Sequence, residues 1–314
     1  MFRVKRMLLV GLLIFGLVAP AAAGEIHWVT DFAAAKAQAK KEKKYLFIDF
    51  TGSDWCGWCK KLEKEVFSQE AFQKKIPQEF IMVQLDFPKK TKQDEKIAKQ
   101  NQELSQKYGV RGFPTVILTD ADGEEFARTG YRAGGPEAYI ANLDGYVQNF
   151  NAYQKLVQEA EKLDGVAKAK KLDEAVSKLV ANGSQRDFNK LSQQIIALDK
   201  DGKAGLKAKY ELPKKLDSIR TELNKSRDFD KALKDLDKLT VEAKAVPPML
   251  QQVYLFQAGI LIKGKGDKAA GMKKLELAQN AAPDTQTGKQ LVKFIARMKA
   301  QNGPGAKPAP DAKK

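Results

Sequence analysis

The chain has 314 residues, a length that favours two domains, each large enough to close its own core. Its composition is that of an ordinary soluble protein, with two cysteines, one histidine and a formal net charge of +16. Two thiols and one imidazole are too few for a four-ligand zinc site, so no metal is expected. Lysines mixed with Asp and Glu along helical stretches, without clustered aromatics, argue against nucleic acid as a partner.

The first 23 residues have the order of a secretory signal. Arg3, Lys5 and Arg6 precede an uncharged run over 7–18, and three alanines follow at 21–23. The run has about 12 residues, whereas a membrane-spanning helix needs about 20. We therefore expect cleavage of residues 1–23, no stable membrane insertion afterwards, and a periplasmic or secreted chain in a compartment where thiols oxidise readily.

Residues 24–150 mix short apolar runs with helical patterns and are predicted to form the first domain. Runs rich in β-branched and aromatic residues predict strands over 45–50, 80–87 and 114–120. The turn that follows predicts a hairpin that pairs 124–131 antiparallel with the preceding strand. Helical patterns cover 31–43, 57–75, 92–107 and 136–149. This alternation predicts an α/β fold, a mixed central sheet with helices on both faces.

Residues 151–302 show helical periodicity alone and predict an all-α C-terminal domain. We expect helices over 151–163, 166–181, 185–199, 203–225, 228–245, 248–263, 266–281 and 285–301. Pro213 should kink or divide the fourth of them. Residues 303–314 lack an apolar anchor, which predicts a disordered tail.

Short related segments begin at Arg186, Arg227 and Gly266. A spacing of about 40 residues is typical of stacked helix pairs. The last pair is similar to the second half of a tetratricopeptide repeat. An irregular helical bundle without repeats remains the alternative.

Both cysteines of the chain lie in the stretch SDWCGWCKK, three positions apart and each directly after a tryptophan. If a helix begins at Cys56, then Cys56 and Cys59 share one face and can form a disulfide within one turn. Unpaired N–H groups at the helix end favour a thiolate and should lower the pKa of Cys56 below the roughly 8.5 of a free thiol. Cys56 is then the nucleophile and Cys59 the resolving thiol. The alternative, a structural disulfide, would normally close a longer loop.

Other residues near the cysteines have simpler interpretations. Gly57 permits close approach of a substrate backbone, and Trp58 places a bulky aromatic between the two thiols. His27 is expected at the surface, without a role. Glycine-rich phosphate loops are absent from the sequence, and no cofactor is expected.

These motifs resemble the thioredoxin-like proteins, in particular an exported subgroup whose active site follows a TGSDWC type of approach. WCGWCKK, the GFPT that ends at Thr115, and DADGEEFARTGY occur in the family order over about residues 26–148. The resemblance implies a thioredoxin fold with a cis peptide between Phe113 and Pro114. In the family this loop faces the sulfurs and offers backbone groups to an extended substrate. Trp55 matches a family tryptophan that shields the site, although burial in the core explains it equally well.

The resemblance also implies a buried carboxylate that moves a proton at the resolving thiol, and Asp49 lies close to that position. The family interval to the first cysteine is six, whereas Asp49 to Cys56 is seven, so Gly52 or a neighbour is an extra residue. Asp54 is the rival for this role, and a plain strand-end aspartate is the third interpretation. Gln84 occupies the place where the family commonly has a lysine.

Two functional hypotheses follow. The first is an exported thiol–disulfide oxidoreductase that exchanges electrons with protein thiols or disulfides, weakly favoured as a reductase, with an unidentified upstream redox partner. The second is a partner-binding helical-repeat protein in which the redox domain is secondary, because helix-pair stacks present concave surfaces. Apolar stripes in the helical part are expected to pack against neighbouring helices; they comprise Phe188, Leu191, Ile195, Phe229, Leu233 and Leu236.

Overall fold

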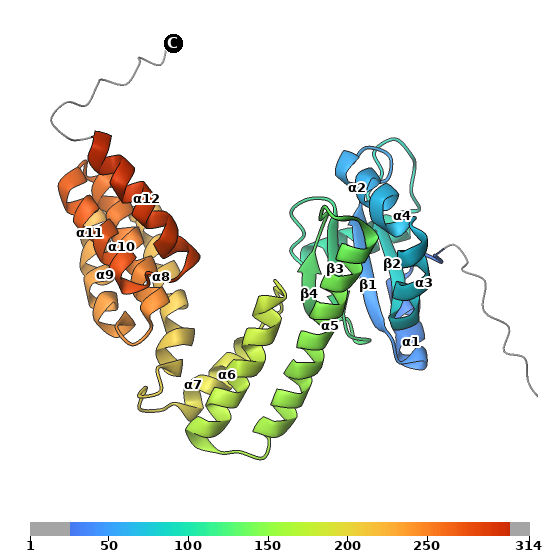
Figure 1. Cartoon of the computed structure of the whole chain (residues 1–314), viewed down its shortest axis with the longest axis horizontal. Coiled ribbons are helices and arrows are strands. Elements are labelled where there is room, and N and C mark those ends of the chain that lie inside the picture. Colours follow the sequence, from blue (N-terminus) through green and yellow to red (C-terminus); the bar gives the residue numbers. More distant parts are fainter. Residues whose placement is uncertain (1–25, 302–314) are drawn as a thin grey trace, which may run out of the picture. The chain divides into compact units, whose positions relative to one another are not determined.

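The computed structural model describes residues 26–301, which form two compact units (Figure 1). The first unit extends to Gln148 and also contains the segment Asn182–Arg186. The second contains Asn149–Ala181 and the chain from Asp187 onward. The division therefore lies close to the boundary expected at residue 150, but the short segment that returns to the first unit was not expected.

The expected signal segment 1–23 and the expected tail 303–314 lie outside the described residues. Across the described range, every helix is too short or too polar to cross a membrane.

A four-stranded mixed sheet forms the centre of the first unit, in the order β2-β1-β3-β4. Strand β1 (Tyr45–Thr51) pairs parallel with β2 (Phe80–Asp86) and antiparallel with β3 (Thr115–Thr119). Strand β4 (Glu125–Thr129) completes the sheet antiparallel to β3. The predicted mixed sheet and its C-terminal hairpin are confirmed.

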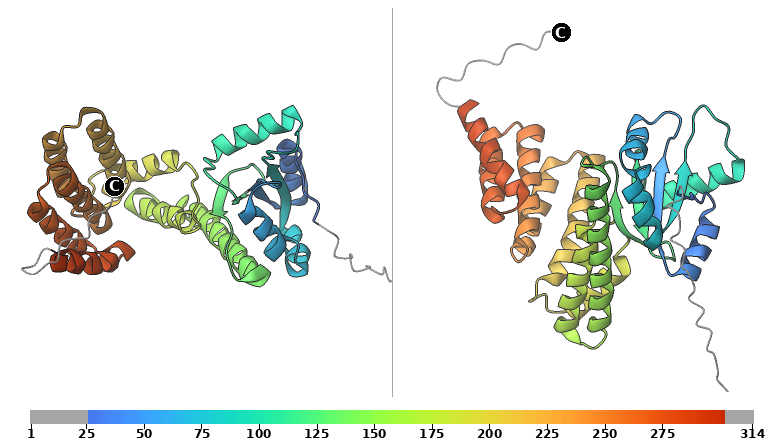
Figure 2. Two further views of the ribbon diagram at one scale, coloured as in Figure 1. Left: turned by 90° about the horizontal axis from the view of Figure 1, so that it is seen from above. Right: turned by 45° about the vertical axis from the view of Figure 1, so that its right-hand side comes forward.

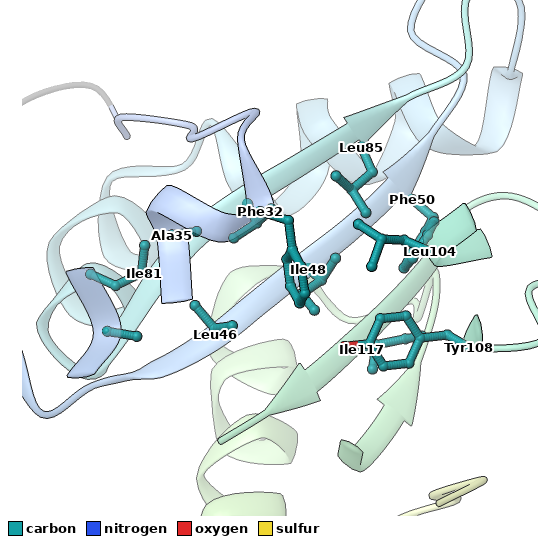
Figure 3. Close-up of a cluster of buried hydrophobic side chains, with 12 residues drawn as sticks. Phe32, Ala35, Leu46, Ile48, Phe50, Ile81, Leu85, Leu104, Tyr108 and Ile117 are labelled. Atoms are coloured by element: carbon teal, nitrogen blue, oxygen red, sulfur yellow. The ribbon is translucent and has the colours of Figure 1, made fainter. Parts of the chain in front are cut away.

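One face of the sheet is covered by α1 (Phe32–Glu42) and α4 (Glu95–Lys107). Figure 3 shows the buried cluster on this face, to which β1 contributes Leu46, Ile48 and Phe50. Side chains alternate between the two faces of a strand, so the intervening residues of β1 lie on the opposite face.

The opposite face is covered by α3 (Glu70–Glu79), by α5 (Gly135–Ala160) and by the π-helical turn η1 (Glu63–Phe67). An aromatic cluster fills the space, with Phe47 of β1 at 5.5 Å from the Phe67 ring and 5.8 Å from the Phe72 ring. Both of these rings also contact Tyr139 of α5. Because Asp49 follows Phe47 by two positions in β1, its carboxyl group belongs to this same buried face.

Both edges of the sheet are covered by short segments from elsewhere in the chain. At the β2 edge, Val29 donates its N–H to Met82 and accepts from the N–H of Gln84. At the β4 edge, the N–H of Arg128 donates to the carbonyl of Asn182 at 3.1 Å. Covered edges remove rows of unpaired backbone groups that would otherwise pair with other chains.

Two helix predictions for the first unit are wrong. The helix expected over 57–75 is divided into α2 (Gly57–Leu62), η1 and α3, because Ser68 donates its hydroxyl back to the carbonyls of η1 and Gln69 is extended. The two helices expected over 136–149 and 151–163 are a single helix, α5. The residues around 150 include neither glycine nor proline, so nothing in the backbone interrupts the helix there.

The second unit is all-α, as predicted. After the end of α5 come α6 (Gly165–Ala181), α7 (Asn189–Leu198), α8 (Leu206–Ser226), α9 (Phe229–Ala243), α10 (Pro247–Gly259), the π turn η2 (Ile260–Gly264), α11 (Lys268–Ala281) and α12 (Gln286–Gln301). Consecutive helices pack side by side within this unit (Figures 1 and 2). The two apolar stripes predicted from the sequence join buried clusters, one around Ile195 and one around Leu236.

Helix α8 continues through Pro213 without a break, so this proline does not divide it. The related segments that begin at Arg227 and Gly266 each supply an aspartate cap: Asp228 accepts from the N–H of residue 231, and Asp267 from that of residue 270. The earlier segment differs, since the N-cap position of α7 is occupied by Phe188 without a side-chain hydrogen bond.

Candidate functional site

The two cysteines lie at the start of α2, directly after the loop that leaves β1. Cys56 occupies the N-cap position, with an extended backbone, and Cys59 lies in the first turn. Their Cα atoms are 5.3 Å apart and their sulfurs form a disulfide of 2.14 Å. The Cys59 N–H donates to the sulfur of Cys56 at 3.1 Å. The Cys56 sulfur therefore lies at the N-terminal end of α2, with the backbone N–H of Cys59 directed at it.

Each cysteine is only 5% exposed in this oxidised state. Both cysteines are therefore buried in the disulfide form. Gly57, by contrast, is exposed, and a side chain there would meet no atom within 4 Å. The backbone between the cysteines is thus open to an approaching chain.

The loop before Cys56 is a tight turn fixed to the end of β2. The N–H groups of Trp55 and Cys56 both donate to the carbonyl of Gly52, at 3.2 and 2.8 Å. Ser53 donates its N–H and its hydroxyl to the carboxylate of Asp86, at 2.8 and 2.6 Å. A Cβ at Gly52 would lie 2.6 Å from the Trp55 indole, so this position requires glycine.

Both tryptophans of the motif lie at the surface. Trp55 is 37% and Trp58 is 58% exposed, so core burial does not explain Trp55. The Trp55 indole N–H donates to the carbonyl of Phe87 at 2.8 Å, and the ring meets Phe113 edge-on at 5.7 Å. The Trp58 ring lies 5.0 Å from that of Tyr131.

The peptide between Phe113 and Pro114 is cis, as the resemblance implies. The Phe113 ring joins this loop to the cysteine loop, because it contacts both Trp55 and Phe87. The Thr115 hydroxyl donates to the carbonyl of Gly112 at 2.7 Å, which stabilises the turn before β3. Residues 113–115 are each partly exposed.

Asp49 is a buried carboxyl group next to the inner cysteine. Its residue is 4% exposed, and its Oδ1 has no hydrogen-bond partner among the described residues. An open pocket is lined by Asp49, Cys59, Glu63 and Gln84, among others. Burial, with smaller contributions from the charges of Glu63 and Asp86, raises the pKa of Asp49 to about 8. Gln84 is the direct parallel-strand neighbour of Asp49 and adds no positive charge.

Asp54 has a different environment. Its carboxylate accepts the backbone N–H groups of Lys89, Lys90 and Thr91, at 3.1, 2.6 and 3.2 Å. These hydrogen bonds hold its pKa below the usual range. Asp54 is therefore an ionised anchor for the loop after β2, whereas Asp49 faces the pocket that Cys59 lines.

The family model for the thioredoxin-like domain matches residues 32–144. The disulfide bond reductase DsbH of Chlamydia pneumoniae is 37% identical over 124 residues, which are 40% of this chain and 74% of that protein. The chain belongs to the thioredoxin-like family. With this membership and the Cys56–Cys59 disulfide, it is a thiol–disulfide oxidoreductase.

Two further comparisons concern the same kind of domain. The thioredoxin-related protein DsbJ of Chlamydia pneumoniae is 33% identical over 105 residues, covering 33% of this chain and 30% of that protein. A solved structure described as DsbH oxidoreductase is 34% identical and covers 43% of this chain and 92% of that chain, with a TM-score of 0.40. The family match ends before α6, so it leaves the helices of the second unit unassigned.

Several residues around this thioredoxin-like site were not identified from the sequence. Glu63 follows Cys59 by four positions, which places it on the same side of the helix, and this spacing could have indicated it. Tyr131 and Lys89 reach the tryptophans only through the fold, so no local signal marks them. Between residues 26 and 301 no group of three or more His, Cys, Asp or Glu side chains is suited to hold a metal ion.

Proposed function

We propose that this chain is an exported reductase of protein disulfides, with Cys56 as the attacking thiol and Cys59 as the resolving thiol. The observation that carries the proposal is the hydrogen bond from the Cys59 N–H to the Cys56 sulfur at 3.1 Å, at the end of α2. A backbone donor directed at one sulfur favours the negative charge of a thiolate on it. Among residues 26–301, the Cys59 sulfur receives no such bond.

The reaction transfers two electrons from the dithiol to the substrate. The Cys56 thiolate attacks one sulfur of the substrate disulfide, forming a mixed disulfide and releasing the first substrate thiolate, which takes a proton from water. The Cys59 thiolate then attacks the sulfur of Cys56, which releases the second substrate thiolate. The product is the Cys56–Cys59 disulfide that the structure shows, and an upstream donor must reduce it again.

Asp49 is the group that we propose to accept the proton of Cys59 before the second attack. Its carboxyl lines the same pocket as Cys59 and has no hydrogen-bond partner on Oδ1. Burial raises its pKa to about 8, so the group can take or release a proton near neutral pH. Asp54 cannot compete for this role while its carboxylate is occupied by three backbone N–H groups.

The substrate segment is proposed to lie across the cis-proline loop and the α2 terminus. Phe113, Pro114 and Thr115 are each partly exposed, and the Phe113 ring contacts that of Trp55, which directly precedes Cys56. Gly57 leaves the approach to the α2 terminus open. An extended chain can therefore offer its disulfide to Cys56 while its backbone pairs with the loop.

Direction and location rest on separate support. The name of the relative DsbH describes a disulfide bond reductase, which favours donation of electrons to substrates. The basic, apolar and small-residue order of 1–23 supports export. An exported reductase depends on a continuous supply of electrons, because the surrounding compartment favours disulfides.

A trapping experiment tests the roles of the two thiols. With Cys59→Ala, mixed disulfides on Cys56 should accumulate on non-reducing gels of the native compartment, because the resolving attack is absent. The matched variant Cys56→Ala should trap none. Mixed disulfides of equal yield on both variants would show that the thiols have no separate roles.

Direction is tested with purified full-length protein. The dithiol form should reduce a disulfide-bonded peptide faster than the disulfide form oxidises the same peptide in its reduced state. The opposite ratio would assign the chain as an oxidase.

A second function is proposed for the helical unit, the binding of a protein partner. Consecutive packing of α8 to α12, with Pro283 and Asp284 between the last two helices, supports a stack of helix pairs. Full-length protein with Cys56→Ser and Cys59→Ser cannot form mixed disulfides. A partner retained by this variant under reducing conditions supports the helical function, whereas complete loss of partners assigns all capture to the thiols.

A further inference from the structure

A lysine ammonium group lies over the ring of each tryptophan in the active-site motif. The Nζ of Lys89 lies 3.9 Å from the ring centre of Trp55, and the Nζ of Lys61 lies 5.2 Å from that of Trp58. Both rings are exposed and each directly precedes a cysteine. A cation over an aromatic face is favoured electrostatically by the negative potential of the ring face. Ammonium groups thus lie over the two indole rings whose residues directly precede the cysteines.

The position of Lys89 is held by the protein rather than left to a free side chain. Asp54 accepts three backbone N–H groups from the segment that begins at Lys89, and the Trp55 indole donates to the carbonyl of Phe87. Lys60 in turn donates its Nζ to the carbonyl of Asp54 at 3.0 Å. Asp54, which lies two positions before Cys56, therefore anchors the loop 88–92 to the redox site.

The loop 88–92 has an excess of positive charge. It contains Lys89, Lys90 and Lys92, all exposed. In the part of the chain that the structure describes, none of these ammonium groups has a carboxylate within salt-bridge distance. Lys61, which lies over Trp58, forms an ion pair with Glu65, whose carboxylate is 3.8 Å from the Lys61 Nζ. The loop 88–92 therefore has an excess of positive charge on the Trp55 side, with its three lysines against the one ionised carboxylate of Asp54 that its backbone surrounds.

We propose that the loop 88–92 selects protein disulfides whose attacked cysteine is flanked by acidic side chains. The inference rests on the proposed reduction of protein disulfides at Cys56. Carboxylates next to the substrate cysteine would meet Lys89 and Lys90. The anion is part of a protein chain, because it must arrive together with a disulfide at Cys56.

The test uses the full-length dithiol protein and three disulfide-bonded peptides that differ only in the residues flanking one cysteine: acidic, neutral or basic. At low salt the acidic peptide should be reduced at least about tenfold faster than the basic one, and the ratio should shrink at high salt because the Debye length shortens. Equal rates for all three peptides would overturn the inference while leaving the reductase function intact. If none of the peptides is reduced, the proposed function itself fails.

Charge-reversed variants locate the effect. Lys89→Glu with Lys90→Glu should abolish or invert the preference for the acidic peptide. The control Lys96→Glu with Lys99→Glu makes the same change in charge at exposed positions of α4 and should leave the preference in place. An equal loss of the preference for the acidic peptide in both double variants would show that the net charge of the protein, and not the loop 88–92, governs the rates.

A second variant separates position from charge. Asp54→Ala makes the protein more positive but removes the anchor of the loop, so the preference for acidic peptides should fall. A preference that grows in this variant would contradict the proposal. If the variant does not fold, the lysine reversals still decide the question.

Discussion

At the scale of single residues, the buried environment of Asp49 affects the stability of the fold and supports the proton transfer that we propose for this group. The side chain is almost completely buried and lines the same pocket as Cys59, and among the described residues its Oδ1 has no hydrogen-bond partner. The neutral carboxyl is consequently favoured in the folded protein.

This environment predicts a pH-dependent gain in stability for Asp49→Asn. Since burial raises the folded-state pKa of Asp49 to about 8, its contribution to stability is complete below its unfolded value near 3.9 and is lost as the pH rises through about 8. Urea unfolding at pH 9 should show the variant more stable by on the order of 5 kcal/mol, with the difference vanishing near pH 4.

The control for this prediction is Asp122→Asn, which removes an exposed carboxylate on the same domain. It should change stability by less than about 1 kcal/mol, because exposed ion pairs contribute little. A difference between wild type and Asp49→Asn that is constant from pH 4 to pH 9 would show that Asp49 does not titrate as proposed.

The close packing of Trp55 against Gly52 leads to a second prediction for a single residue. In Gly52→Ala the new Cβ would lie 2.6 Å from the Trp55 indole, so the ring must move and its hydrogen bond to Phe87 is lost. Overpacking of this kind costs about 1–3 kcal/mol. Urea unfolding followed by tryptophan fluorescence should report both the lower stability and the displaced ring.

The matched control is Gly145→Ala, inside α5, where a new Cβ meets no atom within 4 Å. Replacing a glycine inside a helix should stabilise by roughly 0.5–1 kcal/mol. Equal effects of the two substitutions would mean that Gly52 is not required by the position of Trp55.

At the scale of elements, the segment Asn182–Arg186 completes the edge of the sheet. The buried side chain of Asn182 donates to the carbonyls of Phe126 and Tyr146, at 3.2 and 2.9 Å. Asn182→Ala removes the amide that serves both carbonyls and should lower the free energy of unfolding by about 1–3 kcal/mol.

Thermal unfolding measures this effect against Asn142→Ala, which loses one bond within α5. The control should cost less than the Asn182 variant. If the two variants unfold at the same temperature, the segment does not stabilise the sheet edge.

Patterns that are local in the sequence could be predicted. The strand that begins at Tyr45 and the hairpin that ends at Thr129 follow from runs of apolar residues and from turn chemistry, which neighbouring residues determine. The pairing of Cys56 with Cys59 follows from their spacing alone. These parts of the fold and site needed no knowledge of distant contacts.

Features that depend on tertiary contacts could not be predicted. The return of Asn182 to the sheet depends on carbonyls more than 30 residues away in the sequence. The interruption at Ser68 depends on a side-chain hydroxyl that bonds back to η1. The different environments of Asp54 and Asp49 depend on where the loop after β2 lies. The backbone N–H groups of this loop donate hydrogen bonds to the carboxylate of Asp54 and not to that of Asp49.

At the scale of the whole molecule, the chemistry is confined to the first unit. The Cys56–Cys59 disulfide, the cis-proline loop and Asp49 all belong to the unit that the thioredoxin-like family model matches. The second unit has buried clusters of its own, around Leu236 and Leu275. We therefore assign electron transfer to the first unit and propose partner binding for the second.

The central claim is that Cys56 attacks as a thiolate while Cys59 waits one turn away. The most direct measurement is alkylation of the reduced full-length protein across pH 5 to 9, with each modified cysteine located by mass spectrometry. The account predicts that Cys56 is alkylated first, and at a lower pH than a small free thiol. Alkylation of Cys59 before Cys56, or a Cys56 rate no greater than that of the free thiol at every pH, would contradict it.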